Sequence, residues 1–106
     1  MLSTDPASVL SRDVDIGATQ RLYVTVQVGV FNSDDTSPHS ATFFLKVGSQ
    51  TGAPVTIQMD PKREEYRFIY QCFYGLPEGS LAVEVMALAD VSDHVTVVDV
   101  SMGAHG

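Results

Sequence analysis

Strict alternation of apolar residues in "RLYVTVQVGVF", residues 21–31, constrains the fold of this chain more than any other feature. A β-strand turns successive side chains to opposite faces, whereas a helix would spread the valines of this segment around its circumference. One face of the predicted strand carries Leu22, Val24, Val26, Val28 and Val30, and the other carries Tyr23, Thr25, Gln27, Gly29 and Phe31. The segment therefore predicts a strand that is buried on one side.

Similar alternation recurs along the rest of the chain, between turn-forming residues. The segments are "ATFFLKVG", "VTIQM", "YRFIYQCFY", "LAVEVMA" and "VTVVDVSM", with a possible short strand in "SRDVDIG". Only "DPASVLSR", residues 5–12, carries a possible helical period. Six or seven strands without convincing helices must close their apolar faces against each other. The sequence therefore predicts an all-β fold, an antiparallel two-sheet β-sandwich of the jelly-roll type, with an immunoglobulin-like sandwich as the alternative.

For two of these segments the sequence does not determine which side chains point into the core. In "YRFIYQCFY" both faces are partly apolar, which is expected of a central strand or of a strand with one face against another subunit. In residues 95–102 the inward side chains are either Val95 and Val97, or Val98, Val100 and Met102. Because a slip of one residue inverts every side chain, both possibilities stay open.

Length and charge limit the function classes. A chain of 106 residues and 11.4 kDa has room for one domain. We expect residues 1–20 to form an N-terminal arm, with a possible short strand at Val14 and Ile16, and residues 21–106 to form the sandwich domain. Thirteen acidic and six basic residues give a net charge of -7, which disfavours nucleic acid and anionic membrane surfaces as partners. No secretory signal and no apolar stretch of membrane-spanning length is recognisable.

Residues that could carry chemistry are few and widely spaced. His39, His94 and His105 show no spacing typical of a zinc site, and no G-x-S-x-G turn offers a nucleophile. Cys72, the only cysteine, is best explained as a small apolar residue in a strand. The sequence therefore predicts no enzyme activity, no catalytic or metal-binding residue and no cofactor.

Calcium is a minor alternative for two acidic loops. Asp34 and Asp35 lie in one loop, and Asp90 and Asp93 lie in another. Two loops that meet at one end of a sandwich can supply the six to eight oxygens that calcium prefers. The alternating aspartates of known calcium loops are missing, so solvated acidic loops are the favoured interpretation.

Aromatic residues crowd one segment of the chain. They are Tyr66, Phe68, Tyr70, Phe73 and Tyr74. Such a row can stack bases or sugars, but only Arg67 adds a positive charge there, so nucleic acid gains no support. Tyrosine, with an apolar ring and a polar tip, is common at protein interfaces. A combination of core and interface is therefore favoured over a sugar-binding face.

In order along the chain, "RLYVTVQVGVFNS", "ATFFLKVGSQTGAPVTIQM", "GLPEGSLAVEVMA" and "VTVVDVSM" carry a family resemblance. The pattern of strands and turns over residues 20–102 resembles the small jelly-roll domains of the complement and tumour-necrosis-factor type found in bacteriophage structural proteins. A turn of small residues between Gly75 and Gly79 delivers the strand "LAVEVMA" in this pattern.

The resemblance implies a homotrimer that serves as a virion component. For a chain one domain long, we expect a capsid decoration, or cement, protein that is assembled in the host cytoplasm and binds the major capsid protein on the capsid surface. The expected partner-binding residues come from the arm and from two strands. They are Val9, Leu10, Arg12, Tyr66, Tyr70 and Glu84.

Rival functions belong to other classes. The segment "VTVQVGVFNSDDTSPHSATFFLKVG" also resembles the strand, loop and strand of immunoglobulin-like adhesion domains. A carbohydrate-binding module that uses Tyr66, Tyr70 or Tyr74 is a further alternative, as is a tail-fibre domain. All of these alternatives are binding functions without catalysis.

Overall fold

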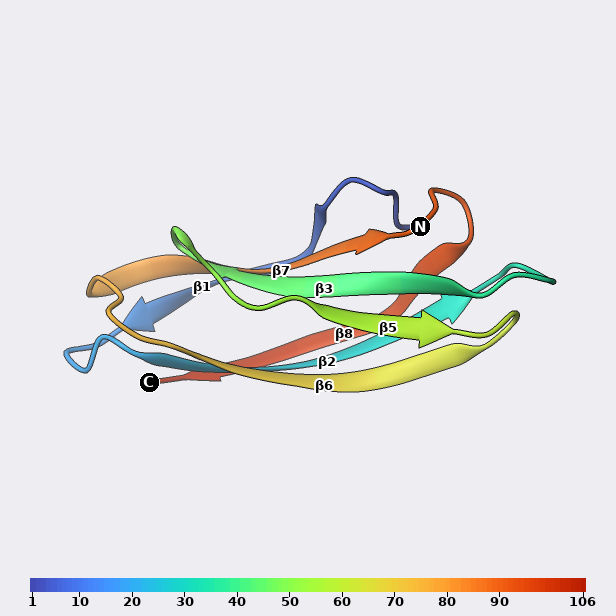
Figure 1. Ribbon diagram of the computed structural model, residues 1–106. Coiled ribbons are helices and arrows are strands. Elements are labelled where there is room, and N and C mark those ends of the chain that lie inside the picture. Colours follow the sequence, from blue (N-terminus) through green and yellow to red (C-terminus); the bar gives the residue numbers. More distant parts are fainter.

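A computed structural model describes residues 1–106 as eight β-strands without a helix (Figure 1). The strands are β1 (Ala7–Ile16), β2 (Leu22–Asn32), β3 (His39–Val47), β4 (Gln50–Thr51), β5 (Val55–Met59), β6 (Glu64–Phe73), β7 (Gly79–Ala89) and β8 (Val95–His105). They form two antiparallel sheets that lie face to face, in a body measuring 51 × 21 × 18 Å. The prediction of an all-β, two-sheet sandwich is confirmed.

The strand order is strongly non-local. One sheet has the order β1-β7-β3, with β4 and β5 both paired to β3, and the other has the order β6-β2-β8. Apart from the segment β3 to β5, every connection crosses from one sheet to the other. In an immunoglobulin constant domain the first two strands are neighbours in one sheet, which differs from the order found here. Because one sheet has three strands, the eight-strand jelly-roll topology is not confirmed either.

Alternating residues build a single core between the sheets. All five inward residues of β2 are fully or almost fully buried, as predicted. Opposite them lie the inward residues of the other sheet, which belong to the same cluster: Ala41, Phe43, Leu45, Val47, Ile57, Met59, Val83, Val85 and Ala87. The inward face predicted for β2 is therefore correct, and burial with a period of two also holds in β3 and β7.

A bulge in β8 resolves the ambiguity of residues 95–102. Gly29 pairs with Asp99 but the next residue, Val30, pairs with Val97, so Val98 is an extra residue on β8. The bulge reverses the alternation, so members of both sets point inward, with Val98 as the exception. Val95 and Val97 pack against the core before the bulge, and Val100 and Met102 pack against it after the bulge, whereas Val98 is 43% exposed.

The aromatic strand β6 lies at an edge of its sheet, since it pairs only with β2. A central position for this strand was therefore wrong. Ile69 and Phe73 point inward and are buried. The alternate residues Tyr66, Phe68 and Tyr70 point outward and remain exposed.

Residues near the N-terminus belong to the sandwich. The possible helix at residues 5–12 is not formed, because β1 pairs with β7 along its whole length, with a bulge at Val9. Leu2 is 5% exposed, and its amide donates a hydrogen bond of 2.8 Å to the Val95 carbonyl. The Ala89 amide likewise donates to the Ser3 carbonyl at 2.8 Å. The strand expected at Val14 and Ile16 is thus ten residues long.

Glycines set the turn between β6 and β7. Gly75 has φ 66° and Gly79 has φ 110°, values that residues with a Cβ rarely adopt. Leu76, within this turn, is 1% exposed and belongs to the core cluster. The sequence signal for a turn before "LAVEVMA" is therefore confirmed.

No part of the chain forms a helix long and apolar enough to cross a membrane.

Leu2 tests whether the N-terminus contributes to folding. We expect Leu2→Ala to lower the free energy of unfolding by about 2–3 kcal/mol, because it leaves a cavity at a buried position of the core cluster. Chemical denaturation of both proteins measures this difference. Met1→Ala is the matched control, since Met1 is 72% exposed, and we expect a change within about 0.5 kcal/mol. Equal stability of Leu2→Ala and the unsubstituted protein would contradict the docked arrangement.

Candidate functional sites

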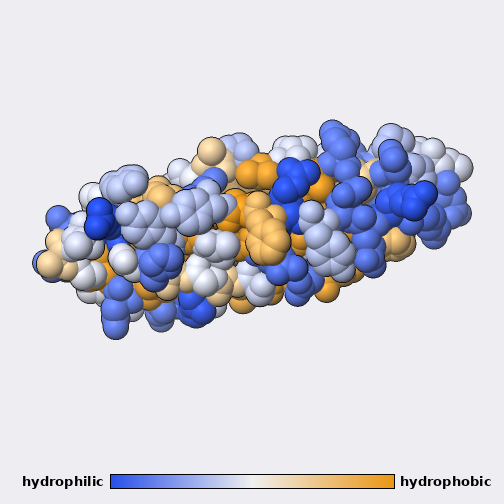
Figure 2. All heavy atoms as spheres, turned by 90° about the horizontal axis from the view of Figure 1, so that it is seen from below, coloured by the Kyte–Doolittle hydropathy of each residue, from blue (hydrophilic) through white to orange (hydrophobic).

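The outer face of the three-strand sheet carries an exposed row of aromatic side chains. Tyr66, Phe68 and Tyr70 of β6 are 52%, 71% and 60% exposed, and Tyr74, just beyond the strand, is 61% exposed. Figure 2 shows this face, where ring side chains gather along the molecule and strongly hydrophilic side chains dominate its right-hand end. The aromatic face, as we call it, consists of this row and the outward residues of β2 and β8. Large exposed rings in one row are uncommon on a monomer and are typical of an interaction site.

Stacked rings order one half of the aromatic face. Tyr23 of β2 lies between Tyr70 on β6 and His105 on β8, at ring centroid distances of 6.4 Å and 5.4 Å. The guanidinium of Arg21 lies 5.8 Å from the centre of the Tyr23 ring, within the range of a cation–π interaction. Three strands thus share one cluster of rings, which limits the motion of each ring.

The other half of the aromatic face is built on a glycine. Tyr66 lies opposite Gly29 in the sheet, and its ring covers the space where a side chain would stand. A Cβ on residue 29 would come 2.8 Å from Tyr66 Cδ2, so only glycine lets the ring lie flat on the strand. The neighbouring Glu64 carboxylate raises the pKa of Tyr66, because a nearby negative charge disfavours the phenolate.

A shallow hollow of about 320 Å³ runs along the middle of the aromatic face. Its lining residues are Thr25, Gln27, Phe68, Ser101, Met102 and Gly103. Phe68 forms an apolar wall beside the polar side chains of Gln27 and Ser101, which lie in register with it. The hollow could accept a side chain or a small polar ligand.

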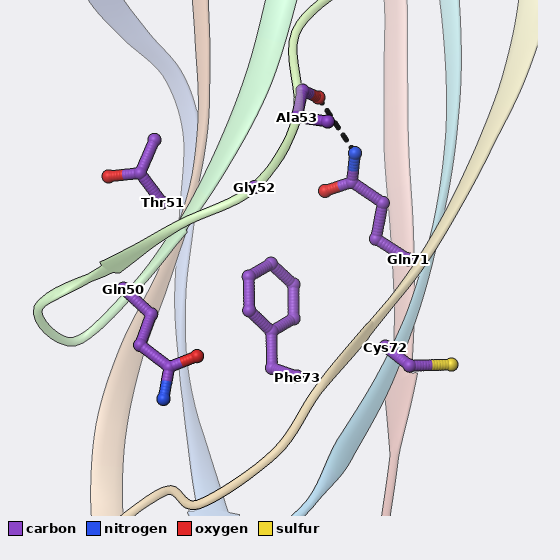
Figure 3. Close-up of a pocket in the computed structure, with 7 residues that line it drawn as sticks. All are labelled: Gln50, Thr51, Gly52, Ala53, Gln71, Cys72 and Phe73. Atoms are coloured by element: carbon purple, nitrogen blue, oxygen red, sulfur yellow. Dashed lines mark hydrogen bonds between the residues drawn. The ribbon is translucent and has the colours of Figure 1, made fainter.

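Another hollow, also of about 320 Å³, lies between β4, the segment that follows it, and β6 (Figure 3). The Gln71 amide donates to the Ala53 carbonyl at 2.8 Å and ties the segment before β5 to β6. In Figure 3 the Phe73 ring points into this hollow, while Cys72 points away from it. A Cβ on Gly52 would collide with the Gln71 amide oxygen, so a larger residue there would displace the Gln71 side chain. These contacts join the sheets and assign no chemistry to the hollow.

A cluster of histidine and aspartate side chains lies at one end of the sandwich. His39, the first residue of β3, places Nε2 2.9 Å from Asp34 Oδ2 and Nδ1 3.1 Å from Asp90 Oδ2. His94 Nε2 lies 3.6 Å from the same Asp34 oxygen, and the two imidazole rings are parallel at 5.3 Å. We call His39, His94, Asp34 and Asp90 the loop-end cluster. The loops at residues 33–38 and 90–94 therefore meet at one end of the sandwich.

Asn32 supports the loop-end cluster from inside the core. It is the last residue of β2 and is fully buried. Its amide nitrogen donates to the carbonyl oxygens of Ser37 and Met59 at 3.0 and 3.2 Å, and its oxygen accepts from the Asp34 amide at 3.0 Å. The sequence analysis missed Asn32, although an asparagine directly after a buried strand is a typical loop-organising residue.

The sequence predicted that the histidines lie far from one another. The structure corrects this prediction for His39 and His94, whose rings are 5.3 Å apart. The separation of 55 positions in the chain closes because β3 and β8 begin at the same end of the sandwich. His105 is elsewhere, stacked on Tyr23. The acidic loops considered for calcium do meet, but imidazole nitrogens stand between Asp34 and Asp90.

Hydrogen bonds explain the charges in the loop-end cluster. Hydrogen bonds that the Asp34 and Asp90 carboxylates accept from the imidazole raise the pKa of His39, and Asp34 contributes most. The pKa of Asp34 is held well below its usual range, first by the Thr36 amide and then by His39. His39 therefore ties the two loops together, because its two ring nitrogens contact a carboxylate from each loop.

The six expected partner-binding residues do not share one surface. Tyr66 and Tyr70 lie on the aromatic face, and Glu84 lies on the outer face of the other sheet, in register with Lys46. The remaining three lie on the edge strand β1: Val9, Leu10 and Arg12. Val9 and Leu10 are half-buried against the core, and Arg12 donates a hydrogen bond to the Met102 carbonyl at 3.3 Å.

Comparison of the chain with protein-family models, with curated proteins and with solved structures gave no match. The geometry of the aromatic face and of the loop-end cluster therefore carries the functional argument.

Stability should fall as the pH rises through the pKa of His39. Because the folded state raises this pKa above 6.5, the contribution of His39 is complete below about pH 6.5 and is lost above the folded pKa. Asp34 behaves in the opposite way, and its contribution is lost as the pH falls below about 3.8. Denaturant unfolding between pH 5.5 and 9, with a chelator present, measures the loss. His39→Gln should remove this pH dependence, and an equally steep loss in the variant would contradict the assignment.

Proposed function

We propose that this protein is a non-enzymatic virion structural protein, a capsid decoration protein that associates as a trimer and stabilises the capsid from outside. The observation that carries the proposal is the exposed aromatic row of β6 on a sheet face that no other part of the chain covers. Interfaces are enriched in tyrosine and phenylalanine, because their rings bury large apolar areas at little entropic cost. The capsid as partner follows from the resemblance of the strand pattern to phage jelly-roll domains.

Local composition of the aromatic face supports burial against protein. Phe68, the most exposed of the rings, lies between Tyr66 and Tyr70, so a partner would remove three adjacent rings from water together. Tyrosine hydroxyls at the rim can keep hydrogen bonds to water or to the partner. Under this proposal the aromatic face forms the contact between subunits.

Contact with the capsid is assigned to the edge of β1, which belongs to the other sheet. The outer edge of β1 is unpaired, because β1 bonds only to β7. This edge presents backbone groups that can pair with an extended segment of a capsid protein. Arg12 and the half-buried Val9 and Leu10 lie along it. The edge of β1 therefore replaces the free arm that the sequence suggested.

Stabilisation of the capsid would follow from mass action. A symmetric trimer that seats where capsid subunits meet binds only the assembled shell. Its binding free energy then adds to the stability of the assembled state, without any catalytic step.

Sedimentation equilibrium tests the subunit contact. We expect the protein to sediment at three times its chain mass of 11.4 kDa, and Phe68→Ser to weaken the association by about 30-fold, as expected for loss of a central ring. Leu88→Ser is the matched control, since Leu88 is a half-buried apolar residue on the outer face of the other sheet, away from the aromatic face. Gly29→Ala should also weaken association, because it displaces Tyr66 without removing a ring. A monomer that also fails to co-sediment with capsids would contradict the proposal.

The hollow beside Phe68 favours one other candidate function, binding of a carbohydrate. Polar groups of Gln27 and Ser101 next to an aromatic wall suit the alternating polar and apolar faces of a sugar ring. A glycan array tests this candidate. Binding that Phe68→Ser abolishes, in a protein that sediments as a monomer, would support carbohydrate binding against the trimer, and an empty array would remove it.

A further inference from the structure

We propose that the loop-end cluster binds one divalent transition-metal ion, best matched by zinc, through His39 Nε2, His94 Nε2 and Asp34 Oδ2. These three donor atoms lie within 4.8 Å of one another. Two nitrogen ligands and one carboxylate oxygen form a donor set common among protein zinc sites. The site would leave one coordination position for water.

Distances between the donors approach those of a tetrahedral site. Metal–ligand bonds of about 2.0–2.1 Å place neighbouring donors about 3.3 Å apart. Asp34 Oδ2 lies 2.9 Å from His39 Nε2 and 3.6 Å from His94 Nε2, one value on either side of that spacing. Both distances lie within a few tenths of an ångström of that spacing, so the larger change needed to bind the ion is in ring orientation.

Outer hydrogen bonds already orient two of the three ligands. The Asp90 carboxylate lies 3.1 Å from His39 Nδ1, so it fixes the ring and directs Nε2 towards Asp34. Asp34 Oδ1 accepts hydrogen bonds from the Thr36 and Ser37 amides at 3.0 and 3.3 Å, which leaves Oδ2 for the two histidines. A carboxylate behind a ligating histidine is a common feature of zinc sites.

His94 is the ligand that has to move. Its ring is parallel to that of His39, with 7° between the planes, and a shared ion must lie near the plane of each ring. The His94 side chain is 37% exposed, whereas that of His39 is 10% exposed, so the His94 ring has room to rotate. The ion would lie between His39 Nε2 and Asp34 Oδ2 and would replace the hydrogen bond that joins these two atoms without metal.

The donor chemistry selects among cations. Calcium and magnesium prefer an all-oxygen shell, and two imidazole nitrogens do not provide one. Imidazole with carboxylate suits zinc and its first-row neighbours. Asp34 is 18% exposed, and His39 is the more buried ligand, so the ion would enter from the side of His94.

Isothermal titration of the chelator-treated full chain with zinc tests the site, with cobalt as a spectroscopic probe. We expect one equivalent to bind, a rise in melting temperature, and visible cobalt absorption bands of a four-coordinate ion. His94→Gln should weaken zinc binding by more than about tenfold, and Asp90→Asn by about 10–100-fold through loss of ring orientation. Calcium at millimolar concentration should leave the melting temperature unchanged.

His105→Gln is the matched control, because it removes an equally common surface ligand outside the loop-end cluster and should leave zinc affinity unchanged. Circular dichroism of each variant shows whether it is folded, and the half-exposed position of His94 makes its replacement compatible with folding. Absence of stoichiometric zinc binding would overturn the proposal. So would zinc binding that His94→Gln leaves unchanged or that His105→Gln abolishes.

Discussion

Burial of one face of β2 is the interaction on which the rest of this structure depends. Its inward aliphatic side chains are removed from water against the other sheet, and its backbone holds both β6 and β8 in register. The outward face of the same strand supplies Tyr23 and Gly29 to the aromatic face. Its last residue, Asn32, organises the loop that carries Asp34. Both candidate sites are therefore attached to one rigid strand, one along its outer face and one at its end.

Periodicity in the sequence was enough to predict the sandwich and most of its core. It could not predict bulges, because an extra residue such as Val98 reverses the alternation that the prediction relies on. A bulge also explains why residues 5–12 suggested a possible helix. The extra residue Val9 interrupts the alternation of β1, so the period of two is not visible there. The possible central position of β6 failed because edge strands with an exposed aromatic face look two-sided in the sequence.

The aromatic residues of the candidate interface were recognisable from the sequence, because they crowd one strand. Convergence of His39 with His94 was not, since it depends on connections that cross between sheets and bring distant loops to one end. Local spacing rules for metal ligands apply to residues on one element or in one loop. The two candidate sites also differ in chemistry. The loop-end cluster consists of charged, hydrogen-bonded side chains, whereas the aromatic face consists mainly of exposed aromatic rings.

In the proposed trimer, the aromatic face of each subunit is covered by a neighbouring subunit. Chemical footprinting of tyrosines, read by mass spectrometry, tests it most directly when dilute monomer and assembled protein are labelled under the same conditions. Tyr66 and Tyr70, exposed in the single chain, should lose most of their reactivity on assembly, because a neighbouring subunit would exclude the reagent. Equal labelling of these two tyrosines in both states would contradict the account.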